Sequence, residues 1–131
     1  MILIENSLNK LKNYIEMQNY NGYDPYDGLE SPLFKVQFIR NNKLIRFLSQ
    51  QLIKRSPLNL RPLLFIKKSC NPVTLGLCIQ AYSYLYLYDS KNKNDYLDKI
   101  GNLIIQLKEM IPSGFSGPCW GYDFDWESRN V

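Results

Sequence analysis

NPVTLGLCIQAYSYLYLY, residues 71–88, is a nearly uninterrupted apolar stretch. Whether it forms a helix or a strand decides the fold class of the chain. Asn71 followed by Pro72 is typical of an N-cap residue with proline at the first helical position. The tyrosines at 82, 84, 86 and 88 alternate with a period of two, which strands favour, but no strand start signal lies near Ala81. We therefore predict a helix over residues 73–88, and its apolar residues on nearly every side predict burial all round.

Further helices are predicted on both sides of this stretch, each from apolar residues at helical spacing. They cover residues 2–19, 33–54 and 94–111, and residues 58–69 are predicted to form a short helix or turn. Gly22 supplies the usual glycine terminator for the first helix. The predicted apolar faces consist of Ile4, Leu8, Leu11 and Ile15; of Phe34, Phe38, Ile45, Leu48 and Leu52; and of Leu97, Ile100, Ile104, Leu107 and Ile111.

The composition is that of a globular protein, since 45% of the 131 residues are hydrophobic and 21% are charged. With the helical pattern it predicts an all-α fold of antiparallel helical hairpins in a single domain, residues 1–131. The absence of histidine excludes Ser-His-Asp catalysis, Cys-His catalysis and His-ligated metal sites within this chain. Three cysteines without a C-x-x-C pair fit neither a disulfide framework nor a zinc site. We expect reduced thiols, no metal or cofactor, no membrane segment and a cytoplasmic location.

Charge is distributed unevenly along the chain. Residues 32–70 contain nine basic side chains and no acidic one, whereas residues 1–31 carry a net charge of −3 and residues 71–131 a net charge of −2. A basic block indicates an anionic partner, such as nucleic acid or a phosphate-bearing substrate. A simpler explanation is a helix with one solvated basic side and one apolar side, and this makes nucleic acid the less favoured partner.

GYDPYDGL, residues 22–29, is rich in turn-forming residues. A turn here places Tyr23, Asp24, Tyr26 and Asp27 close together. In the structural explanation, Asp27 caps a helix that begins near Ser31, or the Asp24 carboxylate bonds to the backbone two residues further on. In the functional explanation, these side chains form part of a binding site, and the sequence leaves both open.

CWGYDFDWESR, residues 119–129, alternates between aromatic and acidic side chains. In an extended chain the rings lie on one side and the carboxylates on the other. Aromatic faces stack on sugar rings and carboxylates accept hydrogen bonds from sugar hydroxyls, while glycoside hydrolysis requires a pair of carboxyl groups. An irregular strand with rings on the helices and acids in solvent explains the pattern equally well. The rings are Trp120, Tyr122, Phe124 and Trp126, and the acids are Asp123, Asp125 and Glu127.

The chain resembles the α/α-toroid (six-hairpin glycosidase-like) proteins in four features taken together. These are the helical hairpins, GYDPYDGL after the first helix, the NPVTLGL opening of the apolar helix, and the CWGYDFDWESR segment. In particular they resemble uncharacterised members associated with bacterial surface-polysaccharide assembly. The resemblance covers most of this chain, but only about the first third of such a toroid. It implies a ring of inner and outer helices whose loops line a carbohydrate-sized cleft at one end. It implies no particular reaction, because members include hydrolases, lyases, epimerases and proteins without an assigned activity, and many toroid lyases use a histidine.

We therefore expect a carbohydrate-binding or carbohydrate-active domain of bacterial polysaccharide metabolism, incomplete as a catalyst, with a saccharide or polysaccharide ligand. The alternative is a non-catalytic helical interaction domain that binds an acidic protein or nucleic acid through residues 32–70. We also expect the chain to be the N-terminal portion of a larger toroid, whose open side pairs with another copy or with the remainder of the ring. The candidate catalytic residues are Asp24, Asp27, Asp123 and Asp125, and the candidate substrate-binding residues are Tyr23, Tyr26, Trp120, Tyr122, Trp126, Glu127 and Arg129.

Overall fold

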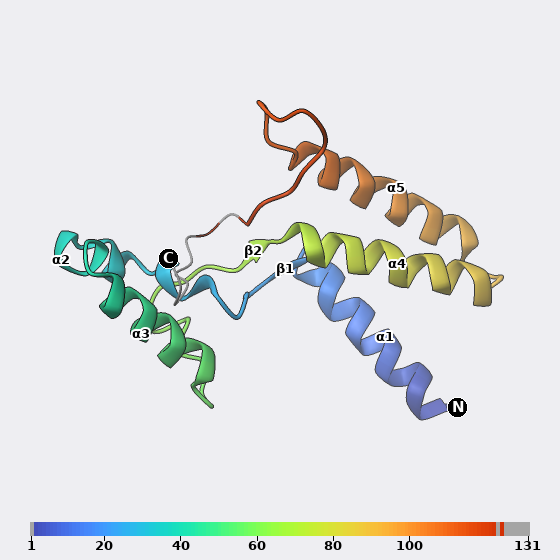
Figure 1. Cartoon of the computed structure of the whole chain (residues 1–131). Coiled ribbons are helices and arrows are strands. Elements are labelled where there is room, and N and C mark those ends of the chain that lie inside the picture. The colour runs from blue at the N-terminus through green and yellow to red at the C-terminus, as the bar shows by residue number, and fades with distance from the viewer. Residues whose placement is uncertain (1, 123, 125–131) are drawn as a thin grey trace. The chain divides into compact units, whose positions relative to one another are not determined.

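The computed structural model describes residues 2–122 and 124, and it is mostly helical, which confirms the all-α prediction. Its elements are α1 (Ile2–Met17), β1 (Asn21–Gly22), the 3-10 helices η1 (Asp27–Glu30) and η2 (Pro32–Lys35), α2 (Gln37–Arg40), α3 (Lys43–Arg55), β2 (Ser69–Cys70), α4 (Pro72–Tyr88) and α5 (Lys93–Glu109) (Figure 1). The two short strands pair with each other. The described residues form two compact units, unit 1 from 2–21 and 70–122, and unit 2 from 22–69 with 124. The single domain inferred from the sequence stays a prediction.

Unit 1 is built on a hairpin of α4 and α5, which lie side by side (Figure 1). The predicted start of α4 is confirmed, since the Asn71 side chain accepts a hydrogen bond from the Val73 backbone N–H and Pro72 is the first helical residue. The helix continues to Tyr88, which excludes the strand alternative. In the connecting turn, Asp89 accepts hydrogen bonds from the Lys91 N–H at 3.1 Å and from the Tyr96 hydroxyl at 3.0 Å. These bonds fix the direction in which α5 leaves the turn.

The core of unit 1 consists of Leu75 and Tyr82 from α4 and Tyr96 and Leu103 from α5. The rings of Tyr82 and Tyr96 stack with their centroids 6.1 Å apart. α1 is attached by Glu16, whose carboxylate accepts hydrogen bonds from the Tyr82 hydroxyl at 2.8 Å and from the Lys99 ammonium at 2.7 Å. Burial raises the pKa of Glu16, but these two bonds together with the positive charges of Lys99 and Lys12 hold that pKa below its ordinary value.

The predicted burial of α4 on all sides is wrong. Leu77 and Leu87 are 61% and 68% exposed, because the neighbours of α4 within unit 1 cover only part of its circumference. The predicted face of α5 is confirmed only in part: Ile100 and Leu107 pack against the core, whereas Ile104 is 37% exposed and the buried residues are Tyr96 and Leu103. Apolar spacing therefore identified these helices correctly, but the sides on which they pack only in part.

The end of α1 also differs from the prediction. The Asn19 N–H bonds to the Glu16 carbonyl and the Tyr20 N–H to the Ile15 carbonyl, which is the Schellman arrangement. Asn19 and Tyr20 adopt left-handed φ angles of 48° and 60°. Asparagine tolerates this conformation better than most residues, so the helix ends before Gly22 is reached, and Gly22 lies in β1.

In unit 2, the continuous helix predicted over 33–54 is broken into η2, α2 and α3. Val36 is extended, with φ −60° and ψ 133°, and separates η2 from α2. Asn41 ends α2, and the Asn42 side chain caps α3 by accepting a hydrogen bond from the Ile45 N–H at 3.1 Å. α3 then buries Gln50 and Ile53, whereas three residues of the predicted apolar face are exposed: Phe38, Leu48 and Leu52.

The 3-10 helices of unit 2 pack closely on their surroundings. A Cβ atom on Gly28 would lie 3.1 Å from Ile53 Cδ1, so glycine allows η1 to approach α3. The Ser31 hydroxyl is fully buried, donates to the Leu64 carbonyl at 2.7 Å and caps η2 by accepting from the Leu33 N–H. Ser31, rather than Asp27, therefore occupies the capping position that the sequence suggested for Asp27.

Cys70, Cys78 and Cys119 are all free thiols in the described structure. Within residues 2–122, none of the helices combines the length and the apolar character that crossing a membrane requires.

Candidate functional site

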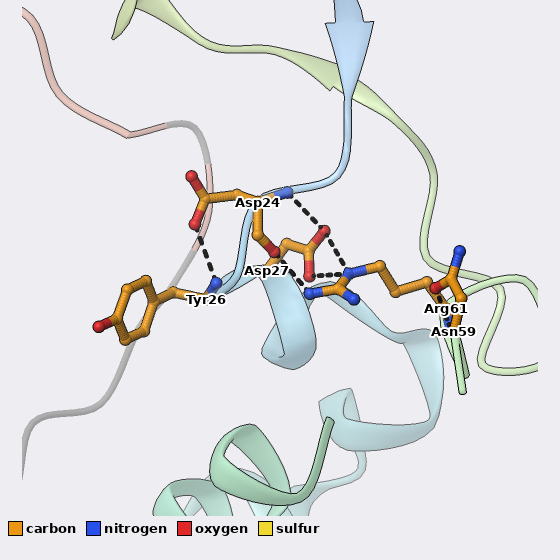
Figure 2. Close-up of polar contacts among 5 residues, drawn as sticks. All are labelled: Asp24, Tyr26, Asp27, Asn59 and Arg61. Atoms are coloured by element: carbon orange, nitrogen blue, oxygen red, sulfur yellow. Dashed lines mark hydrogen bonds and ion pairs between the residues drawn. The ribbon is translucent and has the colours of Figure 1, made fainter. Parts of the chain in front are cut away.

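The loop 22–30 of unit 2 is held together by an ion pair between Asp27 and Arg61 (Figure 2). Arg61 Nε donates to both carboxylate oxygens of Asp27, at 2.7 and 3.0 Å, and Arg61 Nη2 donates to the Asp24 carbonyl at 2.7 Å. The Asn59 side chain accepts a hydrogen bond from the Arg61 backbone N–H, which orients the segment that carries the guanidinium. Only 5% of the Asp27 side chain and 13% of the Arg61 side chain are exposed, so the pair is largely shielded from water.

The two aspartates of this loop stabilise its turn. Asp24 Oδ1 accepts a hydrogen bond from the Tyr26 N–H at 2.9 Å, two residues further on, as the structural explanation of the sequence proposed (Figure 2). Asp27 Oδ2 accepts from the Asp24 N–H at 3.0 Å. Burial raises the pKa of Asp27 above its ordinary value, while Arg61 and the Asp24 N–H act in the opposite direction. A catalytic role for these two carboxylates stays a prediction.

The two tyrosines of the loop each lie beside cationic side chains. The Lys54 ammonium lies 3.8 Å from the centre of the Tyr26 ring and donates a hydrogen bond to its hydroxyl. The Tyr23 ring has the Arg61 guanidinium at 5.6 Å and the Lys68 ammonium at 5.7 Å from its centre. The turn thus brings Tyr23, Asp24, Tyr26 and Asp27 together as predicted, on a part of unit 2 that is both aromatic and basic.

Asp27 also lines a cavity of about 280 Å³ in unit 2, which we call the Asp27 cavity. Its walls carry the rings of Phe65 and Phe124 and the cationic side chains of Lys35 and Lys67. Phe124 is 8% exposed and comes from the aromatic-acidic segment 119–129. Two motifs that lie about a hundred residues apart in the sequence therefore contribute to one cavity. The remaining wall residues are Glu30, Pro32 and Ser69.

Phe65 reaches this cavity from a strained turn. Its N–H bonds to the Pro62 carbonyl and the Ile66 N–H to the Arg61 carbonyl, so Phe65 occupies the position that glycine usually takes at the end of a helical turn. Its φ is 57°, an outlier for a bulky residue, and 68% of the side chain is exposed. The sequence predicted the turn but offered no signal for the role of Phe65, because the left-handed conformation depends on the fold.

Trp120 and Tyr122 belong to unit 1. Trp120 Nε1 donates to the Leu107 carbonyl of α5 at 2.7 Å, and the two side chains are 44% and 55% exposed. Five predicted site residues lie outside the described residues: Asp123, Asp125, Trp126, Glu127 and Arg129. Among residues 2–122 and 124, no group of three or more Cys, Asp or Glu side chains could hold a metal ion.

No protein-family model, curated protein or solved structure matches the chain. The resemblance to α/α-toroid proteins therefore stays a prediction, and function has to be inferred from the contacts within this chain.

Proposed function

We propose that the chain binds a saccharide, with one sugar residue seated in the Asp27 cavity. The observation that carries this proposal is that Asp27, Phe65 and Phe124, from three separate segments, line one cavity. Its volume of about 280 Å³ lies near the lower end for ligand pockets, which begins at about 300 Å³, and suits a single ring rather than a long ligand. The toroid resemblance, which implies polysaccharide metabolism, agrees with this class of ligand.

The carboxylate of Asp27 has a hydrogen-bonding position left for such a ligand. Each carboxylate oxygen offers about two acceptor positions. Oδ2 accepts from Arg61 and from the Asp24 N–H, whereas Oδ1 accepts from Arg61 alone among the residues that the structure describes. The remaining position of Oδ1 suits a sugar hydroxyl, and the ion pair with Arg61 fixes its direction. Asp27 then acts in binding, and the proposal assigns it no proton transfer.

The strain at Phe65 supports a ligand-stacking role for its ring. A left-handed conformation costs a non-glycine residue about 1–2 kcal/mol. About one third of the Phe65 side chain is buried. Scaled from the value for a fully buried side chain, this burial stabilises the fold by only about 0.5–1 kcal/mol, less than the cost of the conformation. Packing alone therefore does not account for phenylalanine at this position. A ring that covers the apolar face of a sugar does account for it.

The charges around the cavity favour a saccharide that carries an acidic group. The charge of Asp27 is balanced by Arg61, and Glu30 lies 3.6 Å from Lys35. Lys67 forms no ion pair with a residue in the described part of the chain. Its ammonium is thus available for a carboxylate on the ligand, as in a uronic acid.

The test is a titration of the isotope-labelled chain with glucose, glucuronic acid and short oligosaccharides of each, followed by backbone amide NMR shifts. We expect shifts at residues 27–35 and 65–69, with tighter binding of the acidic ligands. Phe65→Asn and Phe124→Ala should each weaken binding about tenfold, which corresponds to ~1.4 kcal/mol of stacking. Phe65→Asn suits this purpose because asparagine tolerates the left-handed conformation and the turn is retained.

Phe38→Ala is the matched control, because Phe38 is 73% exposed in the same unit and is not part of the cavity wall. It should leave saccharide binding unchanged. If all three variants bind equally well, or if no saccharide of the panel shifts the cavity amides, the proposal is wrong.

A second candidate function follows from the charge of residues 22–69. Residues 22–69 carry nine basic and three acidic side chains, a net charge of 9 − 3 = +6. Such a surface suits an acidic protein or nucleic acid. Binding of nucleic acid would weaken by orders of magnitude between about 50 and 200 mM salt, whereas stacking of a neutral sugar would change little. A salt titration with single-stranded DNA and with a neutral oligosaccharide separates the two functions.

A further inference from the structure

Helix α4 carries an exposed row of side chains on the side that its neighbours in unit 1 leave uncovered. We call this row the α4 stripe, and its members are Val73, Leu77, Gln80, Tyr84, Leu87 and Tyr88. All of them except Gln80 are apolar or aromatic, and each of those five is more than half exposed. The stripe therefore presents an apolar surface along the whole length of α4, with one glutamine in its middle.

The spacing of the α4 stripe is that of a helix that packs against another helix. Residues 73, 77, 80, 84 and 87 follow one another at intervals of four, three, four and three, which is the heptad spacing of the a and d positions in paired helices. Leu75 and Tyr82, which are buried in the core, lie on the opposite side of α4, because each residue turns the helix by about 100°. Helix α4 thus has one apolar side in the core of unit 1 and a second one at its surface.

The α4 stripe is also uncharged, as is the whole of α4. Helices α1, α3 and α5 each carry at least four charged side chains, which is usual for helices with one side in water. A helix that is apolar on all sides is normally buried on all sides, and a large exposed apolar surface marks an interaction site. The sequence of α4 therefore suits a helix whose exposed side is covered in an assembly.

We infer that two copies of this chain pair through the α4 stripe about a two-fold axis. In such a dimer the same surface lies on both sides of the interface, so a charge on it would lie near its own copy. A surface without charge pairs with itself at no such cost, whereas it offers no complementary charge to an acidic or basic partner. A second copy is therefore the partner that the composition of the stripe favours.

Gln80 has a specific place in this dimer. It lies in the middle of the stripe, so a two-fold axis through that point brings it near Gln80 of the second copy. A glutamine amide has both donors and an acceptor, so the two amides can bond to each other. A single polar position in an otherwise apolar helix pair is a known means of fixing the register of the two helices.

The area of the surface is sufficient for such an interface. A tyrosine buries about 150–250 Å², and the energy of full burial corresponds to about 60–120 Å² for a valine or leucine. Leu8 and Leu11 of α1, both exposed, line a groove with Ala81 of α4 and extend the stripe. Scaled by their exposed fractions, these two leucines and the five apolar members of the stripe offer roughly 500 Å² per copy. Two copies then bury about 1,000 Å², the lower bound for a specific interface, which indicates a dimer of moderate affinity.

The inference goes beyond the proposed saccharide function and does not depend on it. The stripe belongs to unit 1, and none of its residues lines the Asp27 cavity. A variant that loses the dimer should therefore keep the saccharide-induced shifts at residues 27–35. Equally, a chain that binds no saccharide should still form the dimer, so the two proposals can fail separately.

Sedimentation equilibrium of the full chain measures the pairing, and we expect a monomer–dimer equilibrium in the micromolar range. Gln80→Glu and Gln80→Lys should each weaken the dimer about tenfold or more, because two like charges then lie near the axis. An equal mixture of the two variants should dimerise again, since opposite charges then meet across the axis. Gln80 is exposed, so both replacements leave the fold intact, which circular dichroism checks.

Gln106→Glu is the matched control, because Gln106 is an exposed glutamine of α5 in the same unit and lies outside the stripe. It should change dimerisation less than about twofold, as expected for one distant, screened charge. An equal loss in Gln106→Glu and Gln80→Glu would overturn the inference, because association would then follow net charge alone. A mixture of Gln80→Glu and Gln80→Lys that stays monomeric would also overturn it.

Two results with the unchanged chain would contradict the inference as well. A chain that is still monomeric at about 500 µM would leave the stripe to a different protein, since an interface of this size should pair two copies at that concentration. An assembly that grows beyond two copies would exclude the two-fold arrangement, because an isologous interface is closed in the dimer.

Discussion

Replacing Arg61 by methionine tests the ion pair that shapes the loop 22–30. The variant keeps a side chain of similar length but removes the donors to Asp27 and to the Asp24 carbonyl. Because the Asp27 side chain is only 5% exposed, its carboxylate would then stay buried without its cationic partner. Removal of one partner from a buried ion pair costs about 3–5 kcal/mol. Arg61 is 13% exposed and water can reach the vacated position, so we expect a loss of about 3 kcal/mol.

The same variant should have a distinctive dependence on pH. Burial raises the pKa of Asp27 and Arg61 lowers it, so removal of Arg61 raises that pKa further. A carboxyl group whose folded-state pKa exceeds its unfolded value destabilises the folded protein above the folded pKa, and this penalty disappears below the unfolded one. The stability deficit of Arg61→Met relative to wild type should therefore shrink as the pH falls through that interval.

Urea unfolding followed by circular dichroism, at pH about 7 and about 4, measures both effects against wild type under the same conditions. Hydrogen exchange at the Asp24 and Asp27 amides reports the loop itself. The double variant Asp27→Asn with Arg61→Met should be more stable than Arg61→Met alone, because no unpaired buried charge remains. A loss below about 1 kcal/mol, or a deficit that is the same at both pH values, would refute this account of the loop.

Three further predictions concern the rest of the fold. Glu16→Gln should lower the free energy of unfolding by about 1 kcal/mol at neutral pH, because it weakens the bond from Lys99. Since the folded-state pKa of Glu16 is depressed, this difference should disappear as the pH falls through that pKa in urea unfolding, and a constant difference would contradict it. Asn71→Ala should cost about 1 kcal/mol by removing the cap of α4, seen as a lower melting temperature, while Asn71→Asp should retain the wild-type value. Gly28→Val should cost about 1–3 kcal/mol by overpacking against Ile53, and combining it with Ile53→Val should recover part of the loss in chemical denaturation.

The sequence predicted the helices that depend on local signals. The start of α4 follows from the chemistry of Asn71 and Pro72, which need no distant partner. The break between α2 and α3 also had a local signal, since two consecutive asparagines can end one helix and cap the next, but the apolar spacing on both sides concealed it. The buried faces were predicted less well, because apolar side chains outnumber the buried positions in α4 and neighbouring elements select among them.

In the candidate site, too, local contacts were predictable from the sequence and contacts between distant residues were not. The turn at residues 24–27 was predictable, because Asp24 bonds to the backbone two residues further on. The partner of Asp27 was not, since Arg61 lies 34 residues away and nothing distinguishes it in the sequence from the other basic residues of its block. The position of Phe65 in the site could not be predicted either, because its left-handed conformation and its place in the cavity wall both depend on the fold.

The arrangement of charge in residues 22–69 bears on the proposed saccharide site. Residues 22–69 contain three acids, and all three make contacts within the fold: Asp27 is paired with Arg61, Asp24 bonds to the backbone of its own turn, and Glu30 faces Lys35. Within residues 22–69 the basic side chains number nine, three times as many as the acidic ones. Carboxylates held in this way are suited to shaping a cavity and to accepting hydrogen bonds. The excess of basic over acidic side chains in residues 22–69 is suited to attracting an anionic ligand, and a small saccharide with an acidic substituent matches both features.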